Sequence, residues 1–364
     1  MMTRRFIALA LMVSFVGFIS CKKDNNNDTV KVPVQESKDN LNSLAADMQK
    51  DMNAVYEENG WMAANTFVSL MSIEDPVFNG NIVKKSTGKK LTLKSFMHLE
   101  NLKRSGDHVV FADYVGTYTW NAANQGWDIS QNAPSDKIVF NFPLESAQSV
   151  NNNVSLTVYD YQEVEITETD EYGTWTYWEP SAAHADLVVN DTKYLELNYT
   201  AAWNASSGDP QNVSVSLFVK PYTLSLSMSQ ESNTGSAEFI LEEGDVRICS
   251  VGGDVTLNAE TFDVQTITGY VQYRDIKLAG DLNVAAIDAL ETDPTADFLN
   301  TNVDLAFYNY PEDSKFADIN FNDNGPDGLG IDIAFTDGTT IDGYQFVNDL
   351  MATLDSYVQP ASAK

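Results

Sequence analysis

The chain of 364 residues has only two cysteines, Cys21 and Cys249. Small secreted domains that cannot build a large core are held together by several disulfides, and two cysteines in a chain of this length exclude that class. Cys249 lies in the segment DVRICSVGG, which is typical of a strand. We therefore expect Cys249 to be a small packed side chain rather than a nucleophile.

Basic residues are also scarce, with 22 Lys and Arg against 52 Asp and Glu and a formal net charge of −30. A polyanion would be repelled by such a surface, so nucleic acid and anionic lipid surfaces are excluded as partners. The composition favours a soluble, acidic exterior. So many carboxylates would also suit calcium, but composition alone does not locate a calcium site.

Motifs of catalysis are lacking. The three histidines, His98, His108 and His184, form no HExxH or His-x-His pattern, and no GxSxG or common phosphate loop occurs. A pair of carboxylates for glycoside hydrolysis is defined by its spatial separation, which the sequence does not give. We expect a protein that is not an enzyme and has no cofactor, calcium being the one alternative.

The longest apolar run, Phe6–Ile19, follows Arg4 and Arg5 and is shorter than the roughly 20 residues of a membrane-spanning helix. Its charge and length predict a signal peptide over residues 1–20. The segment Phe18-Ile19-Ser20-Cys21 resembles a lipobox. The resemblance implies cleavage before Cys21 and acyl chains on that residue, which would anchor the protein in a membrane. Several chains anchor firmly, because each buried methylene contributes about 0.8 kcal/mol.

Residues 21–38 are polar and rich in Asn, and they predict a flexible tether. Their start, CKKDNNND, is similar to the tethers of surface-exposed lipoproteins of Bacteroidetes. This similarity implies the outer membrane and favours the cell surface over the periplasm. Asp28-Thr29-Val30 also resembles the O-glycosylation site of that phylum, which makes Thr29 a candidate for modification.

The body is expected to begin at residue 39 with a helix over 39–72, broken near Asn59-Gly60. Its apolar residues are spaced by three and four, and we expect this face to pack on a sheet, with a Met-rich binding face as the alternative. The residues of the face are Leu41, Leu44, Met48, Met52 and Val55.

Apolar and polar residues alternate from 187 to 258, which predicts an antiparallel meander with one apolar face. One of its hairpins is expected to turn at Gly252-Gly253. Further strands are predicted at 109–120, 137–142, 154–168 and 174–178, and in DLAFYNY, FADINF and LGIDIAF. Helices are predicted at 283–291 and near the carboxyl end of the chain.

This order of elements predicts an α+β fold: a large curved antiparallel β meander partly covered by N-terminal, inserted and C-terminal helices. No clean linker divides residues 39–364, so a single body is expected, with a subdivision near 275 as the alternative.

Oxygen-bearing side chains alternate at Asp318, Asn320, Asn322 and Asn324 before Gly325. Such alternation is typical of a calcium loop. The same residues also suit a hairpin turn between two strands, which is the simpler interpretation.

Aromatic residues gather near the end of a predicted strand, at Tyr172, Trp175, Tyr177 and Trp178. Alternation places Trp175 and Tyr177 on one face and Trp178 on the other. Exposed rings could stack on a glycan or dock a protein partner, whereas cross-strand pairing inside a sheet is the structural alternative.

Together these patterns predict a lipid-anchored envelope protein with a binding or structural role. As a surface glycan-binding protein it would use the aromatic residues near 172–178. As a carrier of lipid or lipoprotein it would hold acyl chains between the sheet and the 39–72 helix; its element order resembles that of periplasmic lipoprotein carriers. As a subunit of an envelope complex it would expose an apolar patch to a partner protein.

Overall fold

The computed structural model describes residues 32–56, 59–73, 110–170, 173–261, 263–290, 292–325 and 328–355. Its helices are α2 (Val34–Tyr56), α3 (Asn59–Ile73), the short 3-10 helix η1 (Phe111–Asp113), α6 (Val284–Asp288), α7 (Ala296–Asn302) and α8 (Gly343–Asp355). Its strands are β1 (Gly116–Asn121), β2 (Gly126–Gln131), β3 (Lys137–Phe142), β4 (Val154–Asp170), β5 (Gly173–Val189), β6 (Thr192–Trp203), β7 (Pro210–Val219), β8 (Tyr222–Glu231), β9 (Thr234–Glu243), β10 (Val246–Leu257), β11 (Val264–Tyr273), β12 (Ile276–Asn283), β13 (Val303–Asn309), β14 (Ser314–Asn322), β15 (Gly330–Phe335) and β16 (Thr340–Asp342).

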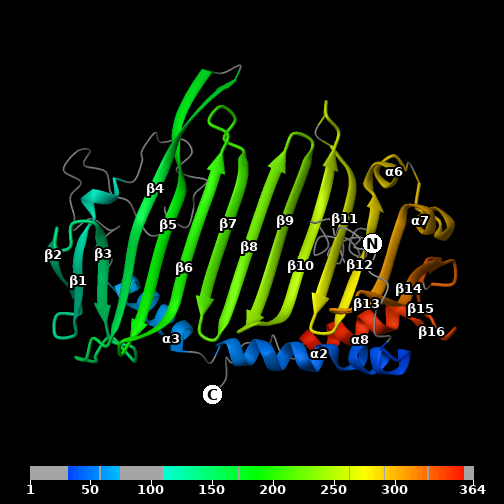
Figure 1. Cartoon of the computed structure of the whole chain (residues 1–364), viewed down its shortest axis with the longest axis horizontal. Helices are drawn as coiled ribbons and strands as arrows, with labels where there is room; N and C mark the ends of the chain where they lie inside the picture. Colours follow the sequence, from blue (N-terminus) through cyan, green and yellow to red (C-terminus); the bar gives the residue numbers. More distant parts are fainter. Residues whose placement is uncertain are drawn as a thin grey trace. The chain divides into compact units, whose positions relative to one another are not determined.

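The strands are hydrogen-bonded in the order β2-β1-β3, followed by β4 to β16 in sequence (Figure 1). Strands β3 to β7 and β9 to β16 pair antiparallel with their neighbours in the chain, as do β1 and β2, whereas β1 and β3 are parallel. The α+β class and the antiparallel meander are thus confirmed. The meander is favoured because a chain of alternating apolar and polar residues, joined by short turns, pairs each strand with the next one.

Several expectations differ from the structure in detail. The strand predicted at 109–120 begins only at Gly116, because Phe111–Asp113 form the 3-10 helix η1. The predicted turn at Gly252-Gly253 is wrong, because both glycines lie inside β10. The region after 283 contains a second helix, α7, that the sequence pattern did not reveal. Helix α2 begins at Val34, so residues 34–38, predicted to belong to the tether, are helical.

Contacts within the chain divide it into two compact units. Unit 1 comprises residues 1–54 with 228–364, and unit 2 comprises residues 55–227. The boundaries fall within α2 and β8, whereas the subdivision considered from the sequence lay near residue 275.

In unit 2, helix α3 covers the apolar face of the strands near β1, β3 and β4. Phe67 lies at the centre of this contact, with its ring centroid 5.0 Å from that of Phe140 and 5.4 Å from that of Phe142. The Thr66 hydroxyl donates a 2.8 Å hydrogen bond to the Leu144 carbonyl. Gly60 lets the helix approach the sheet closely, because a Cβ there would lie 2.7 Å from Val219 Cγ1.

In unit 1, one face of β12–β15 is apolar and is covered at both ends. At one end it packs against α2 and α8, through Leu41 and Phe346. At the other end it packs against α6 and α7, through Ile287 and Leu299. Since each strand offers one apolar face, these helices are the means by which the described part of unit 1 removes that face from water.

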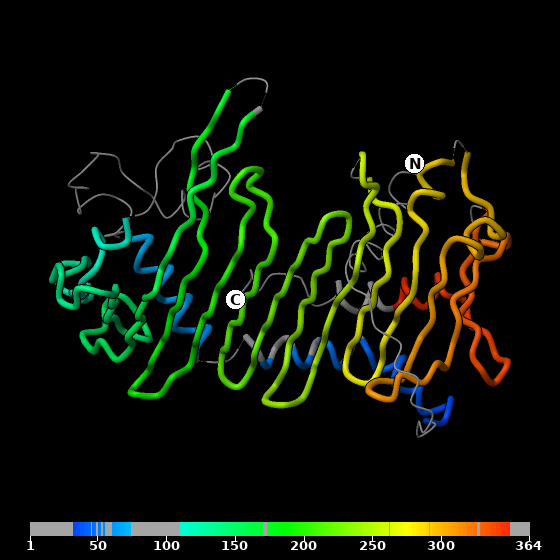
Figure 2. The backbone as a smooth tube through the Cα atoms, turned by 45° about the horizontal axis from the view of Figure 1, so that its top comes forward, coloured from blue at the N-terminus to red at the C-terminus, as the bar shows by residue number. Residues whose placement is uncertain are grey.

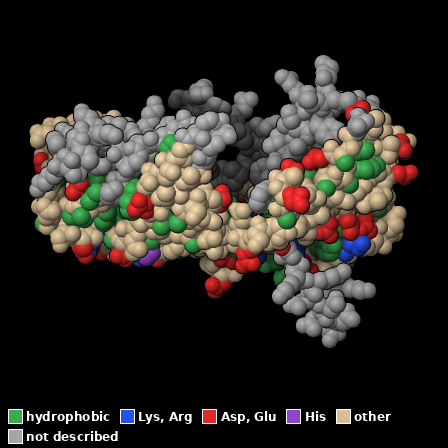
Figure 3. Space-filling model, turned by 90° about the horizontal axis from the view of Figure 1, so that it is seen from above, with side chains coloured by type: hydrophobic (Ala, Val, Ile, Leu, Met, Phe, Trp, Pro, Cys, Tyr) green, Lys and Arg blue, Asp and Glu red, His purple; other side chains and the backbone are tan. Residues whose placement is uncertain are grey.

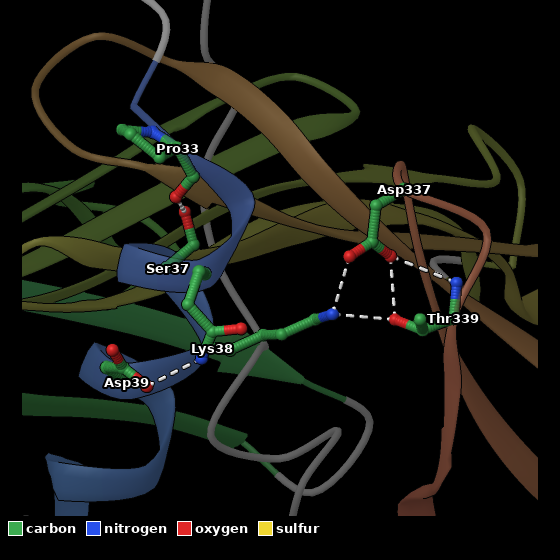
Figure 4. Close-up of polar contacts among 7 residues, drawn as sticks. Pro33, Ser37, Lys38, Asp39, Asp337 and Thr339 are labelled. Atoms are coloured by element: carbon green, nitrogen blue, oxygen red, sulfur yellow. Dashed lines mark hydrogen bonds and ion pairs between the residues drawn. The ribbon is translucent and has the colours of Figure 1, made fainter.

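Polar contacts fix the first turns of α2 to the sheet (Figure 4). The Lys38 ammonium donates 2.7 Å hydrogen bonds to Asp337 Oδ2 and Thr339 Oγ1, and it lies 4.6 Å from the Phe335 ring centroid. The neighbouring Ser37 hydroxyl donates to Asn309 Oδ1 at 2.7 Å in the protein interior. These partners lie some 270 to 300 positions away in the sequence.

A second contact holds α2 near its carboxyl end. Asp51 is 9% exposed and accepts two hydrogen bonds from Arg274, at 2.9 Å from Nε and 2.6 Å from Nη2. It accepts a third from the Tyr273 hydroxyl. These hydrogen bonds raise the pKa of Arg274, chiefly through Asp51, so the guanidinium stays charged. A two-pronged pair of this kind sets both the position and the orientation of the helix.

We predict that the Lys38 contact makes stability depend on acidic pH. The hydrogen bond from Lys38, followed by those from Thr339, lowers the pKa of Asp337 below its usual 3.8. A lowered pKa stabilises the folded state above about pH 4, and this contribution is lost as the pH falls through the folded-state pKa. The Lys38→Met variant should therefore show a smaller drop in Tm between pH 5 and pH 2 than the wild-type protein.

The control is Lys50→Met, which removes an exposed charge from the same helix. Its pH dependence should match that of the wild-type protein. Equal acid sensitivity of Lys38→Met and wild type would contradict the assignment.

Candidate functional site

The central strands of unit 1 form three apolar rows on the face that bears α2 and α6–α7 further along. The register places side chains of β9, β10, β11 and β12 side by side. The first row is Phe239, Val251, Val271 and Leu278; the second is Ala237, Gly253, Gly269 and Gly280; the third is Gly235, Val255, Ile267 and Leu282. We call these three rows the glycine-row face.

The middle row of the glycine-row face carries nothing larger than a methyl group. Adjacent rows are two residues apart along a strand, or about 7 Å, and four strands span about 14 Å. The two outer rows therefore rise on either side of a low apolar strip that crosses the strands. Phe239, Val251, Val271 and Leu278 are half-buried, so the first row is not fully covered. In the middle row Ala237, Gly253 and Gly269 are buried. In the third row Ile267 and Leu282 belong to the core cluster that includes α6 and α7. None of the twelve residues has a charged or hydrogen-bonding side chain, so the surface suits an apolar ligand.

The opposite face of the same strands is polar. Tyr270 lies against Gly252, where a Cβ would come within 2.8 Å of its ring. Its hydroxyl donates to Glu238 at 2.7 Å, and the Lys277 ammonium lies 5.1 Å from its ring centroid. Burial, followed by Glu238, raises the pKa of Tyr270. This close approach explains why a glycine is needed within β10, where the sequence suggested a turn.

Among the charged side chains seen from above, acidic ones are more frequent than basic ones (Figure 3). In unit 2, Lys193 bridges two of them, 2.6 Å from Asp186 Oδ1 and 2.8 Å from Glu196 Oε2. These hydrogen bonds, with Asp186 first, raise the pKa of Lys193. His184 lies nearby on β5, with Nδ1 3.5 Å from Asp160 Oδ2. Lys193 is thus held between two carboxylates of the neighbouring strands β5 and β6.

The predicted aromatic site lies on the long β4–β5 hairpin, which extends past its neighbours (Figures 1 and 2). Trp175 is 39% exposed, opposite Glu168 in the register. Trp178 is half-buried, opposite Glu165. Tyr177 is only 5% exposed, and Tyr172 lies outside the described residues. Trp175 is therefore the most accessible described member of the set.

Tyr177 is buried because the β6–β7 loop covers it. The loop carbonyl of Ala205 accepts a 2.9 Å hydrogen bond from the Thr167 amide. Gly208, with φ of +71°, lies so close that a Cβ there would overlap the Tyr177 hydroxyl. Burial, followed by Glu168 and Glu179, raises the pKa of Tyr177. This loop lies about 30 residues away in the sequence, so the local pattern gave no sign of the contact.

The calcium candidates lie on β14 and in the turn after it. Asp318 pairs with Lys315 at 2.8 Å, and Asn322 Oδ1 accepts a hydrogen bond from the Asn324 amide at 2.8 Å. Asn320 is exposed on the same strand. Strands β14 and β15 are antiparallel neighbours, with Asn322 opposite Gly330. In the described part of the chain, no group of three or more His, Cys, Asp or Glu residues is placed to hold a metal ion.

Cys249 is unpaired and half-buried on β10. Burial, followed by the nearby Asp51 charge, raises the pKa of its thiol to about 11. A thiol with such a pKa is protonated at neutral pH and is a poor nucleophile. Cys21 and Thr29 lie outside the described residues, as does the predicted tether before Val32.

Comparisons with known proteins identify no relative: no family model, curated protein or solved structure matches this chain. Among the helices of the described residues, none is long and apolar enough to span a membrane.

The glycine-row face was not anticipated from the sequence. The sequence did contain a pattern that predicts part of it. A hairpin with a two-residue turn at Arg274-Asp275 pairs Gly269 with Gly280.

We predict that Gly208→Ala destabilises the protein by roughly 1–3 kcal/mol, from the positive φ and the overlap with the Tyr177 hydroxyl. In the Tyr177→Phe background, which removes that hydroxyl, the cost should be smaller. Urea unfolding of the two single variants and the double variant measures the coupling. An equal cost of Gly208→Ala in both backgrounds would show that the loop does not rest on Tyr177.

Proposed function

We propose that this protein is a lipid-anchored outer-membrane lipoprotein that binds an apolar ligand on the glycine-row face and catalyses no reaction. The observation that carries the ligand proposal is the low apolar strip, flanked by two apolar rows, across β9–β12. The lipobox-like segment ending at Cys21 and the polar residues after it support the anchor.

An acyl chain is the ligand class that fits best. The face offers no hydrogen-bonding side chain, so it could not distinguish or satisfy a polar ligand, whereas burial of methylenes needs only apolar contact. The rows run across the strands, which suits an extended chain more than a compact one. A carrier or receptor of acylated molecules is therefore favoured over a subunit of an envelope complex.

Anchoring and location have their own test. We predict that the purified protein carries several acyl chains, which mass spectrometry would place on Cys21, and that Cys21→Ser releases it from the membrane. Protease added to intact cells should remove the body if it faces outward. An unacylated Cys21 would refute the anchor, and a body that is protected until the outer membrane is opened would place it in the periplasm.

Ligand binding is tested with a fluorescent fatty acid titrated into the Cys21→Ser protein. Phe239→Ala should weaken binding roughly tenfold, because it removes the largest side chain of the first row. Ile240→Ala is the matched control: it is the next residue of β9, is also half-buried and faces the opposite side. Failure of the wild-type protein to bind the fatty acid, or equal effects of the two variants, would refute this site.

Surface glycan binding is the second candidate, and the exposure of Trp175 favours it. An exposed indole opposite the Glu168 carboxylate could stack on a sugar ring while the acid accepts hydroxyl protons. Loss of oligosaccharide binding in Trp175→Ala, with fatty-acid binding unchanged, would support this second function.

A further inference from the structure

The exposed Trp175 ring lies in a part of the chain that has no strongly basic side chain. Residues 138–192, which include both strands of the β4–β5 hairpin, contain no Lys or Arg, and His184 is their one histidine. The same residues contain ten Asp and Glu. A ligand that approaches the protruding hairpin (Figure 2) therefore meets a negative potential.

The Trp175 indole is positioned by its neighbours on the hairpin. It extends along β5 over Gly173, where a Cβ would lie 3.9 Å from the ring. Directly opposite, on β4, stands the exposed carboxylate of Glu168. The Tyr177 hydroxyl donates a 3.4 Å hydrogen bond to Glu168 Oε2, which confirms that Glu168 shares one face with Trp175 and Tyr177.

The β6–β7 loop bounds this face on the side of Tyr177. Gly208 rests on the Tyr177 hydroxyl, and the next residue, Asp209, is exposed. Burial, followed by the negative charges of Glu168, Glu179 and Asp209, raises the pKa of Tyr177, so the Asp209 charge acts at this position. Since Tyr177 and Trp175 are two residues apart on one strand, the loop stands about 7 Å from the row of the indole.

We call the surface formed by Trp175, Glu168 and Asp209 the Trp175 face. Both of its components attract positive charge, because an aromatic ring draws a cation to its face and the carboxylates pair with it. An acidic ligand would be repelled here. A neutral ligand would gain the stacking contact but would leave the charges of Glu168 and Asp209 unused.

A sugar ring suits the Trp175 face better than an isolated ammonium group. Ammonium ligands that are recognised alone are enclosed by a cage of several rings. Among the described aromatic residues of the hairpin, Tyr177 is buried and Trp178 lies on the other face, so Trp175 offers one open ring. A sugar can lie flat on that ring and place an amino group at its edge, where the Glu168 carboxylate stands.

We propose that the Trp175 face binds a glycan that carries protonated amino groups, with the sugar stacked on the indole and an ammonium group paired with Glu168 and Asp209. This inference rests on the glycan-binding candidate of the proposed function and names its ligand class. It is independent of the acyl-chain site and of the anchor at Cys21.

The test compares two probes that differ in charge: a tetramer of glucosamine and the same tetramer with every amine acetylated. Calorimetric titration into the Cys21→Ser protein at 20 mM NaCl should show roughly fivefold tighter binding of the glucosamine tetramer. The preference should shrink at 300 mM NaCl, because salt screens exposed charges.

Two variants separate the charge from the ring. Glu168→Gln keeps an acceptor for the Tyr177 hydroxyl but removes the charge, so it should weaken the glucosamine tetramer about fivefold and leave the acetylated tetramer unchanged. Trp175→Ala should weaken both tetramers roughly tenfold. The matched control is Glu165→Gln, which removes an exposed charge from the same strand on the opposite face and should have little effect. Circular dichroism confirms that each variant is folded.

The outcomes distinguish this inference from the glycan-binding candidate itself. Equal binding of the two tetramers, lost in Trp175→Ala, would retain glycan binding and overturn the preference for a cation. Equal effects of Glu168→Gln and Glu165→Gln would overturn the role of Glu168. Failure of both tetramers to bind would remove the candidate and the inference together. Tetralysine that binds as tightly as the glucosamine tetramer and depends on Trp175 would overturn the assignment to a sugar.

Discussion

The structure depends on how the apolar face of a long antiparallel meander is removed from water. Hydrogen bonding between neighbouring strands satisfies the backbone, but it does nothing for the apolar side chains that alternation collects on one face. In unit 1 the helices α2, α6, α7 and α8 cover these apolar side chains, and in unit 2 helix α3 does so. Each of these helices covers only part of a face, and the first row of the proposed ligand site stays half-buried.

Placement of α2 on unit 1 relies on polar contacts as well as apolar ones. The Asp51 carboxylate is bound by Arg274 and Tyr273, while Lys38 is bound by Asp337 and Thr339. A buried carboxylate without a partner would destabilise the fold. The ion pair therefore disfavours other positions of the helix, even where its net contribution to stability is small. These contacts define where the helix lies on a sheet whose apolar face would accept it at several positions.

Glycine has two distinct roles in this chain. At Gly208 a positive φ and a close neighbour exclude any side chain, and the loop can therefore cover Tyr177. In β10, Gly252 makes room for the Tyr270 ring on the polar face, and Gly253 lies beside Gly269 on the apolar face without a side chain. The same residue type thus allows close packing of a loop at one place and of an aromatic ring at another.

Alternation with a period of two by itself determined the strands, their apolar faces and the α+β class, because those properties depend on neighbours in the chain. The apolar run before Cys21 likewise gives the expected anchor without any reference to the fold. Tertiary structure decided which glycines turn the chain, since a turn and a close approach of Tyr270 require the same residue. It also buried Tyr177 beneath a loop about 30 residues away, and it extended α2 back to Val34 by supplying Ser37 and Lys38 with partners some 270 to 300 residues distant. Contacts of that kind are set by packing between segments that are remote in sequence, and no local pattern encodes them.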